Sequence, residues 1–85
     1  MNAKDVSGTI LIVDDEPSLR MAMTFDFKRR GYNVLSASNG EEAYSVFLEN
    51  KIDLVLSDLR MAGGDGISLL ERIRNVSHES PIVMF

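Results

Sequence analysis

The chain has 85 residues, of which 45% are hydrophobic, and it carries a formal charge of −4. This length allows one small domain, and this share of apolar residues predicts a packed core rather than a disordered tail. The acidic balance argues against direct nucleic-acid binding, which needs a basic face. Because the chain has no cysteine, disulfides and thiolate metal sites are excluded.

Membrane and export signals are absent from the sequence. No apolar run is long enough to span a bilayer, and residues 1–8 lack the apolar core of a signal peptide. We therefore expect a cytosolic (cytoplasmic) protein that makes no membrane contact.

Strand-like and helix-like stretches alternate along the chain. Short apolar runs predict buried strands over 9–13, 32–38, 52–57 and 81–85. Apolar residues at helical spacing lie between these runs and predict three helices. The first opens at Pro17 and ends before Gly31, the second is capped by Asn39, and the third covers 67–75. Strands that alternate with helices indicate a parallel sheet with right-handed crossovers.

The inward faces of the helices follow from the same spacing. The residues expected to face the core are Leu19, Ala22, Met23, Phe27, Ala43, Val46, Phe47, Leu70 and Ile73. Residues 59–66 contain three glycines and are expected to form a loop.

Three aspartates directly follow two of the predicted strands. Asp14 and Asp15 come after the apolar run 10–13, and Asp58 comes after 52–57. If these strands are parallel neighbours, the carboxylates meet at one sheet edge and repel one another unless a cation lies among them. A few carboxylates, completed by water and a phosphate oxygen, are the usual ligands of Mg²⁺. The pattern points to phosphoryl chemistry, with helix capping by Asp14 or Asp15 as the alternative.

Two segments around these acids carry a family resemblance. Ile-Leu-Ile-Val-Asp-Asp-Glu-Pro (10–17) and Leu-Val-Leu-Ser-Asp-Leu-Arg-Met (54–61), with Gly66 after them, resemble the receiver domain of two-component response regulators. The resemblance runs through nearly the whole chain. It implies a flavodoxin-like α/β fold with the order β-α-β-α-β-α-β and strand order 2-1-3-4. Residues 1–85 would then be the N-terminal portion of one receiver domain, lacking the final α-β-α of the family.

The resemblance also implies roles for particular residues. Asp58 would accept a phosphoryl group from a sensor histidine kinase or a phosphotransfer protein. The Mg²⁺ ligands would be Asp15 directly, Asp14 through water, Asp58 itself, and the backbone carbonyl of Arg60. The protein would be a signalling switch rather than an enzyme that turns over an external substrate. Physical chemistry agrees, because Mg²⁺ shields the repulsion between a carboxylate nucleophile and a phosphoryl group.

The sequence departs from the family pattern in two places. Ala62 stands where the family usually has proline, and Gly63 and Gly64 follow it, so a looser loop is expected beside Arg60. The family's Ser or Thr after the fourth strand, and its lysine after the fifth, would fall beyond Phe85.

Two other functions stay open from the sequence alone. A phosphatase of the haloacid dehalogenase type would need Asp-x-Asp, and Arg60 occupies the position of the second acid. A phosphorylation-independent interaction fragment, which is a degenerate or truncated receiver, is the other alternative, although all three acids are present. The apolar fourth strand with no following helix also predicts self-association.

Overall fold

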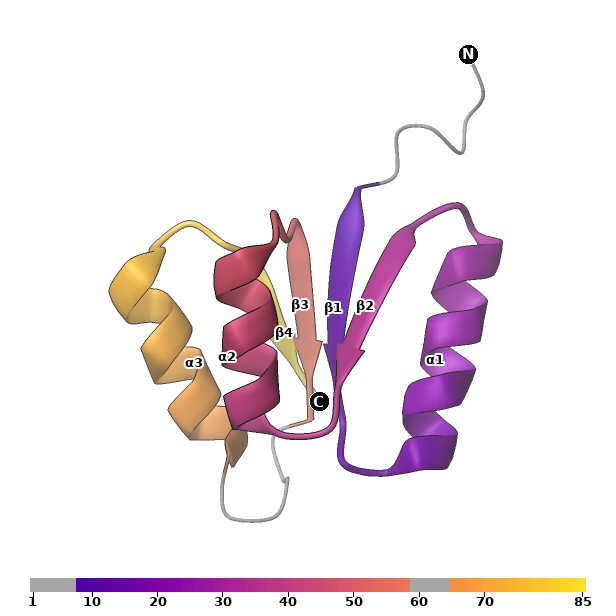
Figure 1. Cartoon of the computed structure of the whole chain (residues 1–85), viewed down its shortest axis with the longest axis horizontal. Coiled ribbons are helices and arrows are strands. Elements are labelled where there is room, and N and C mark those ends of the chain that lie inside the picture. The colour runs from indigo at the N-terminus through magenta and orange to yellow at the C-terminus, as the bar shows by residue number, and fades with distance from the viewer. Residues whose placement is uncertain (1–7, 59–64) are drawn as a thin grey trace.

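A computed structural model describes residues 8–58 and 65–85 of the chain. Their elements are β1 (Thr9–Val13), α1 (Pro17–Arg29), β2 (Asn33–Ala37), α2 (Gly40–Glu49), β3 (Leu54–Ser57), α3 (Asp65–Val76) and β4 (Ile82–Met84). The strands form one parallel sheet in the order β2-β1-β3-β4 (Figure 1). The flavodoxin-like fold class and the strand order expected from the sequence are thus confirmed.

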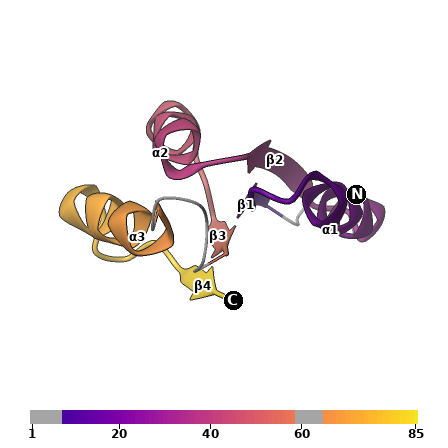
Figure 2. The same ribbon diagram turned by 90° about the horizontal axis from the view of Figure 1, so that it is seen from below.

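The sheet separates the helices into two layers. Seen along the strands, α1 lies on one side of the sheet, and α2 and α3 lie on the other (Figure 2). Because successive side chains of a strand point to opposite faces, β1 supplies both layers. Leu11 and Val13 join the core under α2 and α3, while Ile10 and Ile12 belong to the opposite face. Burial on both faces explains why β1 is a continuous apolar run.

The main core lies between the sheet and the α2–α3 layer. Its buried members are Leu11, Val13, Ala37, Ala43, Val55, Leu69 and Ile73, with Val46 and Phe47 packed against them. The predicted inward faces of the second and third helices are therefore correct except at one position. Leu69 is buried and Leu70 only half-buried. The helical spacing of the buried residues on α3 was predicted correctly, but the buried face is turned by about one residue from the predicted one.

The prediction for α1 was wrong for two residues. Leu19 is 44% exposed and Ala22 is also exposed, while Met23 and Phe27 are half-buried. The half-buried side of the helix also includes Arg20, Thr24 and Asp26. A helix that contacts mainly β1 and β2 buries a narrow face, and polar side chains occupy more than half of it. The number of apolar residues in α1 therefore overstated how much of this helix is buried in the core.

The helix ends follow local chemistry. Gly31 has a φ of 100°, the left-handed conformation expected of a glycine just after a helix. Asn39 caps α2, since its side chain accepts a hydrogen bond from Glu42 N at 2.8 Å. The third helix begins at Asp65, two residues earlier than expected, because a glycine in the first turn of a helix is tolerated. The rest of the predicted glycine loop, residues 59–64, lies outside the described part.

Candidate metal site

The carboxyl ends of β1 and β3 bring the three aspartates together. In the parallel register Val13 pairs with Ser57, so Asp14 and Asp58 leave the sheet at the same level. Two backbone hydrogen bonds extend the sheet by one residue, from Asp58 N to Val13 O at 2.9 Å and from Asp14 N to Ala37 O at 3.1 Å. The sheet itself thus fixes where Asp14 and Asp58 begin.

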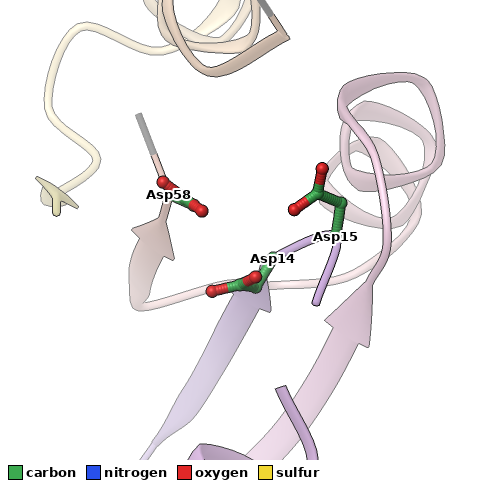
Figure 3. A group of neighbouring side chains, drawn as sticks. All are labelled: Asp14, Asp15 and Asp58. Carbon is green, nitrogen blue, oxygen red and sulfur yellow. The ribbon is translucent and has the colours of Figure 1, made fainter. Parts of the chain in front are cut away.

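The carboxylates form the single group of potential metal ligands found among the described residues. One oxygen from each of Asp14, Asp15 and Asp58 lies within 4.8 Å of the others (Figure 3). Asp14 is fully buried, Asp58 is half-buried and Asp15 is exposed. The group therefore runs from a fully buried carboxylate to one that is exposed to solvent.

Asp14 carries the most direct sign of a cation. Its Oδ1 accepts a hydrogen bond from Glu16 N at 2.8 Å, whereas its buried Oδ2 has no hydrogen-bond partner. An unpaired buried carboxylate oxygen is costly, and so are three carboxylates gathered at one point. A hard divalent cation satisfies both, and oxygen ligands alone suit Mg²⁺. The residues present therefore fit this ion.

Helix capping is not the role of the aspartate pair. Glu16 is the N-cap of α1, and its Oε1 accepts a hydrogen bond from Ser18 N at 2.7 Å. The capping alternative raised for Asp14 and Asp15 is therefore wrong. The Oδ1 of Asp14 accepts the N–H of Glu16, which lies before the helix, and its buried Oδ2 takes no part in capping.

Two residues beside the acids were not singled out from the sequence. Arg20 is half-buried and donates from Nη1 to the backbone oxygen of Asp14 at 2.7 Å. Ser57 is fully buried and donates from Oγ to the backbone oxygen of Asp58 at 3.2 Å. The only sequence signal for Arg20 was its position one turn after Pro17. Ser57 had a weaker signal, as a hydroxyl within an apolar strand.

The first turn of α2 places another acid, Glu42, near Arg20. The backbone N–H and the hydroxyl of Ser38 donate to Glu42 Oε1 at 2.8 and 3.0 Å. These bonds, with a smaller contribution from the charge of Arg20, lower the pKa of Glu42 below its ordinary value. Glu42 therefore stays ionised at neutral pH, and Arg20, which bonds to the backbone of Asp14, is near enough for its charge to act on this acid.

Other predicted features are placed as follows. Arg60, whose carbonyl was expected to bind the metal, lies outside the described residues, as do Ala62, Gly63 and Gly64. His78 is exposed in the loop between α3 and β4. None of the helices in the described part of the chain combines the length and apolar character needed to cross a membrane.

Comparisons with known proteins identify the family. The model of the response regulator receiver domain matches residues 10–85. The autoinducer 1 sensor kinase/phosphatase LuxN of Vibrio harveyi is 40% identical over 77 residues, which are 91% of this chain and 9% of LuxN. The chain thus spans about a tenth of that relative. By family match, fold and acidic site together, this chain belongs to the response regulator receiver domains of two-component signalling.

Solved structures support the same assignment. The response regulator TrrA of Thermotoga maritima, in complex with Mg²⁺-BeF, is 35% identical with a TM-score of 0.85, over 91% of this chain and 67% of TrrA. A complex of the histidine kinase ThkA with TrrA matches with a TM-score of 0.83 and 35% identity, over 91% of this chain and 66% of the matched chain.

Proposed function

We propose that Asp58 accepts a phosphoryl group and that Asp14 and Asp15 hold Mg²⁺ beside it. The observation that carries the proposal is the meeting of three carboxylates at the ends of β1 and β3, one of them with an unpaired buried oxygen. Asp58 is the half-buried member and lies on the strand opposite the other two. Metal ligands gathered around the nucleophile would hold the ion beside the oxygens on which charge develops during phosphoryl transfer.

In the proposed reaction a carboxylate oxygen of Asp58 forms a bond to phosphorus. The phosphorus–nitrogen bond of a donor phosphohistidine breaks, and the imidazole nitrogen takes up the electron pair. When bound, Mg²⁺ supplies positive charge that neutralises the transferring oxygens. Asp14 and Asp15 hold the ion, and the hydroxyl of Ser57 holds the backbone of Asp58. The backbone carbonyl of Arg60 remains a proposed further ligand.

The proposed donor is a sensor histidine kinase or a phosphotransfer protein. The complex of ThkA with TrrA shows that pairing for TrrA, and it supports the same class of partner here. In this role the chain changes state once for each phosphoryl group rather than turning over an external substrate. The cytosolic location stays a prediction, and it is consistent with this role.

The experiment uses a small phosphodonor, acetyl phosphate, with Mg²⁺ and intact-mass spectrometry. The wild-type chain should gain one phosphoryl group, and Asp58→Asn should gain none. Asp53→Asn is the matched control, because Asp53 lies at the opposite end of β3, where its Oδ2 accepts a hydrogen bond from Thr9 N at 2.8 Å. Asp53→Asn should be labelled like the wild type.

The outcome separates the three functions considered. Labelling of Asp58→Asn equal to that of the wild type would contradict the proposed acceptor. A wild-type chain that binds Mg²⁺ but gains no phosphoryl group would favour the phosphorylation-independent fragment. Continuous release of phosphate without a trapped acyl phosphate would favour the phosphatase alternative.

We also propose that copies of this chain self-associate through β4. Among the described strands β4 is an edge strand, and Val83 is 50% exposed and Phe85 46% exposed. The pairing of Leu56 with Val83 places these side chains on the face opposite to α2 and α3. An exposed apolar edge favours pairing with another strand, and a second β4 offers the same edge and the same apolar face.

Light scattering over a range of concentrations tests this association. The mean mass of the wild type should rise with concentration. The mean mass of Val83→Lys should stay close to that of the monomer, because lysines on an edge strand disfavour pairing. Val76→Lys is the control, since Val76 is 53% exposed on α3, which covers the face of the sheet opposite to Val83. A wild type that stays monomeric at every concentration would refute the association.

A further inference from the structure

Arg20 makes a contact that concerns the metal site directly. Its Nη1 donates to the backbone oxygen of Asp14 at 2.7 Å, and the bond is partly buried. That oxygen belongs to the peptide group that joins Asp14 to Asp15. A guanidinium donor makes this bond charge-assisted, so it is shorter and stronger than a neutral one.

A second hydrogen bond fixes the peptide group on the other side of Asp15. The N–H of Glu16, in the peptide that joins Asp15 to Glu16, donates to Asp14 Oδ1 at 2.8 Å. Glu16 is itself tied to the helix, because Arg20 N donates to Glu16 O at 3.0 Å. Both peptide groups that flank Asp15 are therefore held, one by the side chain of Arg20 and the other by that of Asp14.

Asp15 needs such support more than the other two acids. It is the exposed member of the group and lies two residues beyond the end of β1, whereas Asp14 directly follows β1 and Asp58 directly follows β3. The direction of its Cα–Cβ bond is set by the two flanking peptide planes. Groups that orient a metal ligand in this way strongly affect metal affinity.

We propose that Arg20 is a positioning residue that orients Asp15 toward Mg²⁺ by holding the peptide between Asp14 and Asp15. This inference rests on the proposed function, because it assumes that the acidic group binds the ion. It assigns Arg20 no contact with the metal or the phosphoryl group.

Electrostatics and positioning predict opposite effects of removing Arg20. The guanidinium is a positive charge beside the acids, and charge repulsion alone would make its removal tighten cation binding. The negative charge of the nearby ionised Glu42, which interacts with the guanidinium, offsets part of that repulsion. If positioning dominates, removal weakens binding instead. The sign of the change therefore distinguishes the two roles.

The experiment titrates the chain with Mn²⁺, a hard cation that also prefers oxygen ligands, and measures free Mn²⁺ by electron paramagnetic resonance. Arg20→Met keeps the apolar stem but removes the donors, and it should raise the Kd for Mn²⁺ about tenfold, as loss of an outer-shell partner commonly does. Lys28→Met removes the same charge from the far end of α1, and its Kd should equal that of the wild type. Arg20→Lys should fall between the wild type and Arg20→Met.

Melting of each metal-free variant separates positioning from a merely structural role. A structural role would lower the melting temperature and leave the Kd unchanged, whereas positioning changes the Kd. Binding by Arg20→Met as tight as the wild type, or tighter, overturns the inference. If Arg20→Met does not fold, Arg20→Lys decides: weaker binding than the wild type supports positioning, and equal or tighter binding overturns it. A wild type that binds no Mn²⁺ overturns the proposed function and this inference together.

Discussion

Replacing Asp14 with asparagine should remove most of the stabilisation that Mg²⁺ gives to this chain. At an Mg²⁺ concentration about 100 times the Kd, a single site stabilises the folded wild type by about 2.7 kcal/mol. For a domain of this size, that corresponds to a rise in melting temperature of roughly 10 °C or more. Asp14→Asn keeps an oxygen that can accept the Glu16 N–H, but it replaces the unpaired Oδ2 with an amide NH₂, which is not a cation ligand.

The same variant should be at least as stable as the wild type without metal. An amide at this position relieves repulsion among the three carboxylates and can donate to Asp15 or Asp58. Thermal unfolding followed by circular dichroism, with and without Mg²⁺, measures both effects. Asp53→Asn is the control and should keep the full Mg²⁺ shift. An equal Mg²⁺ shift in Asp14→Asn and the wild type would show that Asp14 takes no part in the metal site.

Replacing Ile73 with alanine should destabilise the fold by about 3 kcal/mol. Ile73 is fully buried in the core between α3 and the sheet, and deletion of such a side chain leaves a cavity as well as losing apolar burial. This is a large part of the total stability of a native domain, about 5–15 kcal/mol. Urea unfolding should show a lower midpoint with a similar slope.

Ile67 on the same helix provides a matched control. It is 49% exposed, so Ile67→Ala loses little burial and gains helix propensity. The expected cost is about 1 kcal/mol or less. If the two substitutions lowered the free energy of unfolding equally, the result would contradict the packing of α3 against the sheet through Ile73.

The sequence predicted the strands and the meeting of the acids well because both depend on one strong pattern. The short apolar run of β1 indicated a strand buried on two faces, and the parallel arrangement then placed Asp14 and Asp58 at one edge. No tertiary detail was needed for that step. The resemblance to the receiver family supplied the strand order, which periodicity alone does not give.

The rest depended on contacts that periodicity does not contain. The apolar residues of α1 suggested a wide inward stripe, but Leu19 and Ala22 face solvent and Arg20 turns toward the site. An arginine on a helix is ordinarily read as a surface charge, so its bond to the carbonyl of Asp14 could not be foreseen. Likewise, only the structure showed that Glu16 is the N-cap of α1. Because Glu16 takes this role, Asp14 is available to the acidic group.

The most direct test of the central claim is to locate the phosphoryl group on the chain. After incubation with acetyl phosphate, borohydride reduces an aspartyl phosphate to homoserine, and tandem mass spectrometry identifies the position. We predict homoserine at position 58 when Mg²⁺ is present and almost none when Mg²⁺ is removed by chelation. Modification at another position, or modification of Asp58 that is independent of Mg²⁺, would contradict a site in which Asp14 and Asp15 hold the ion that serves Asp58.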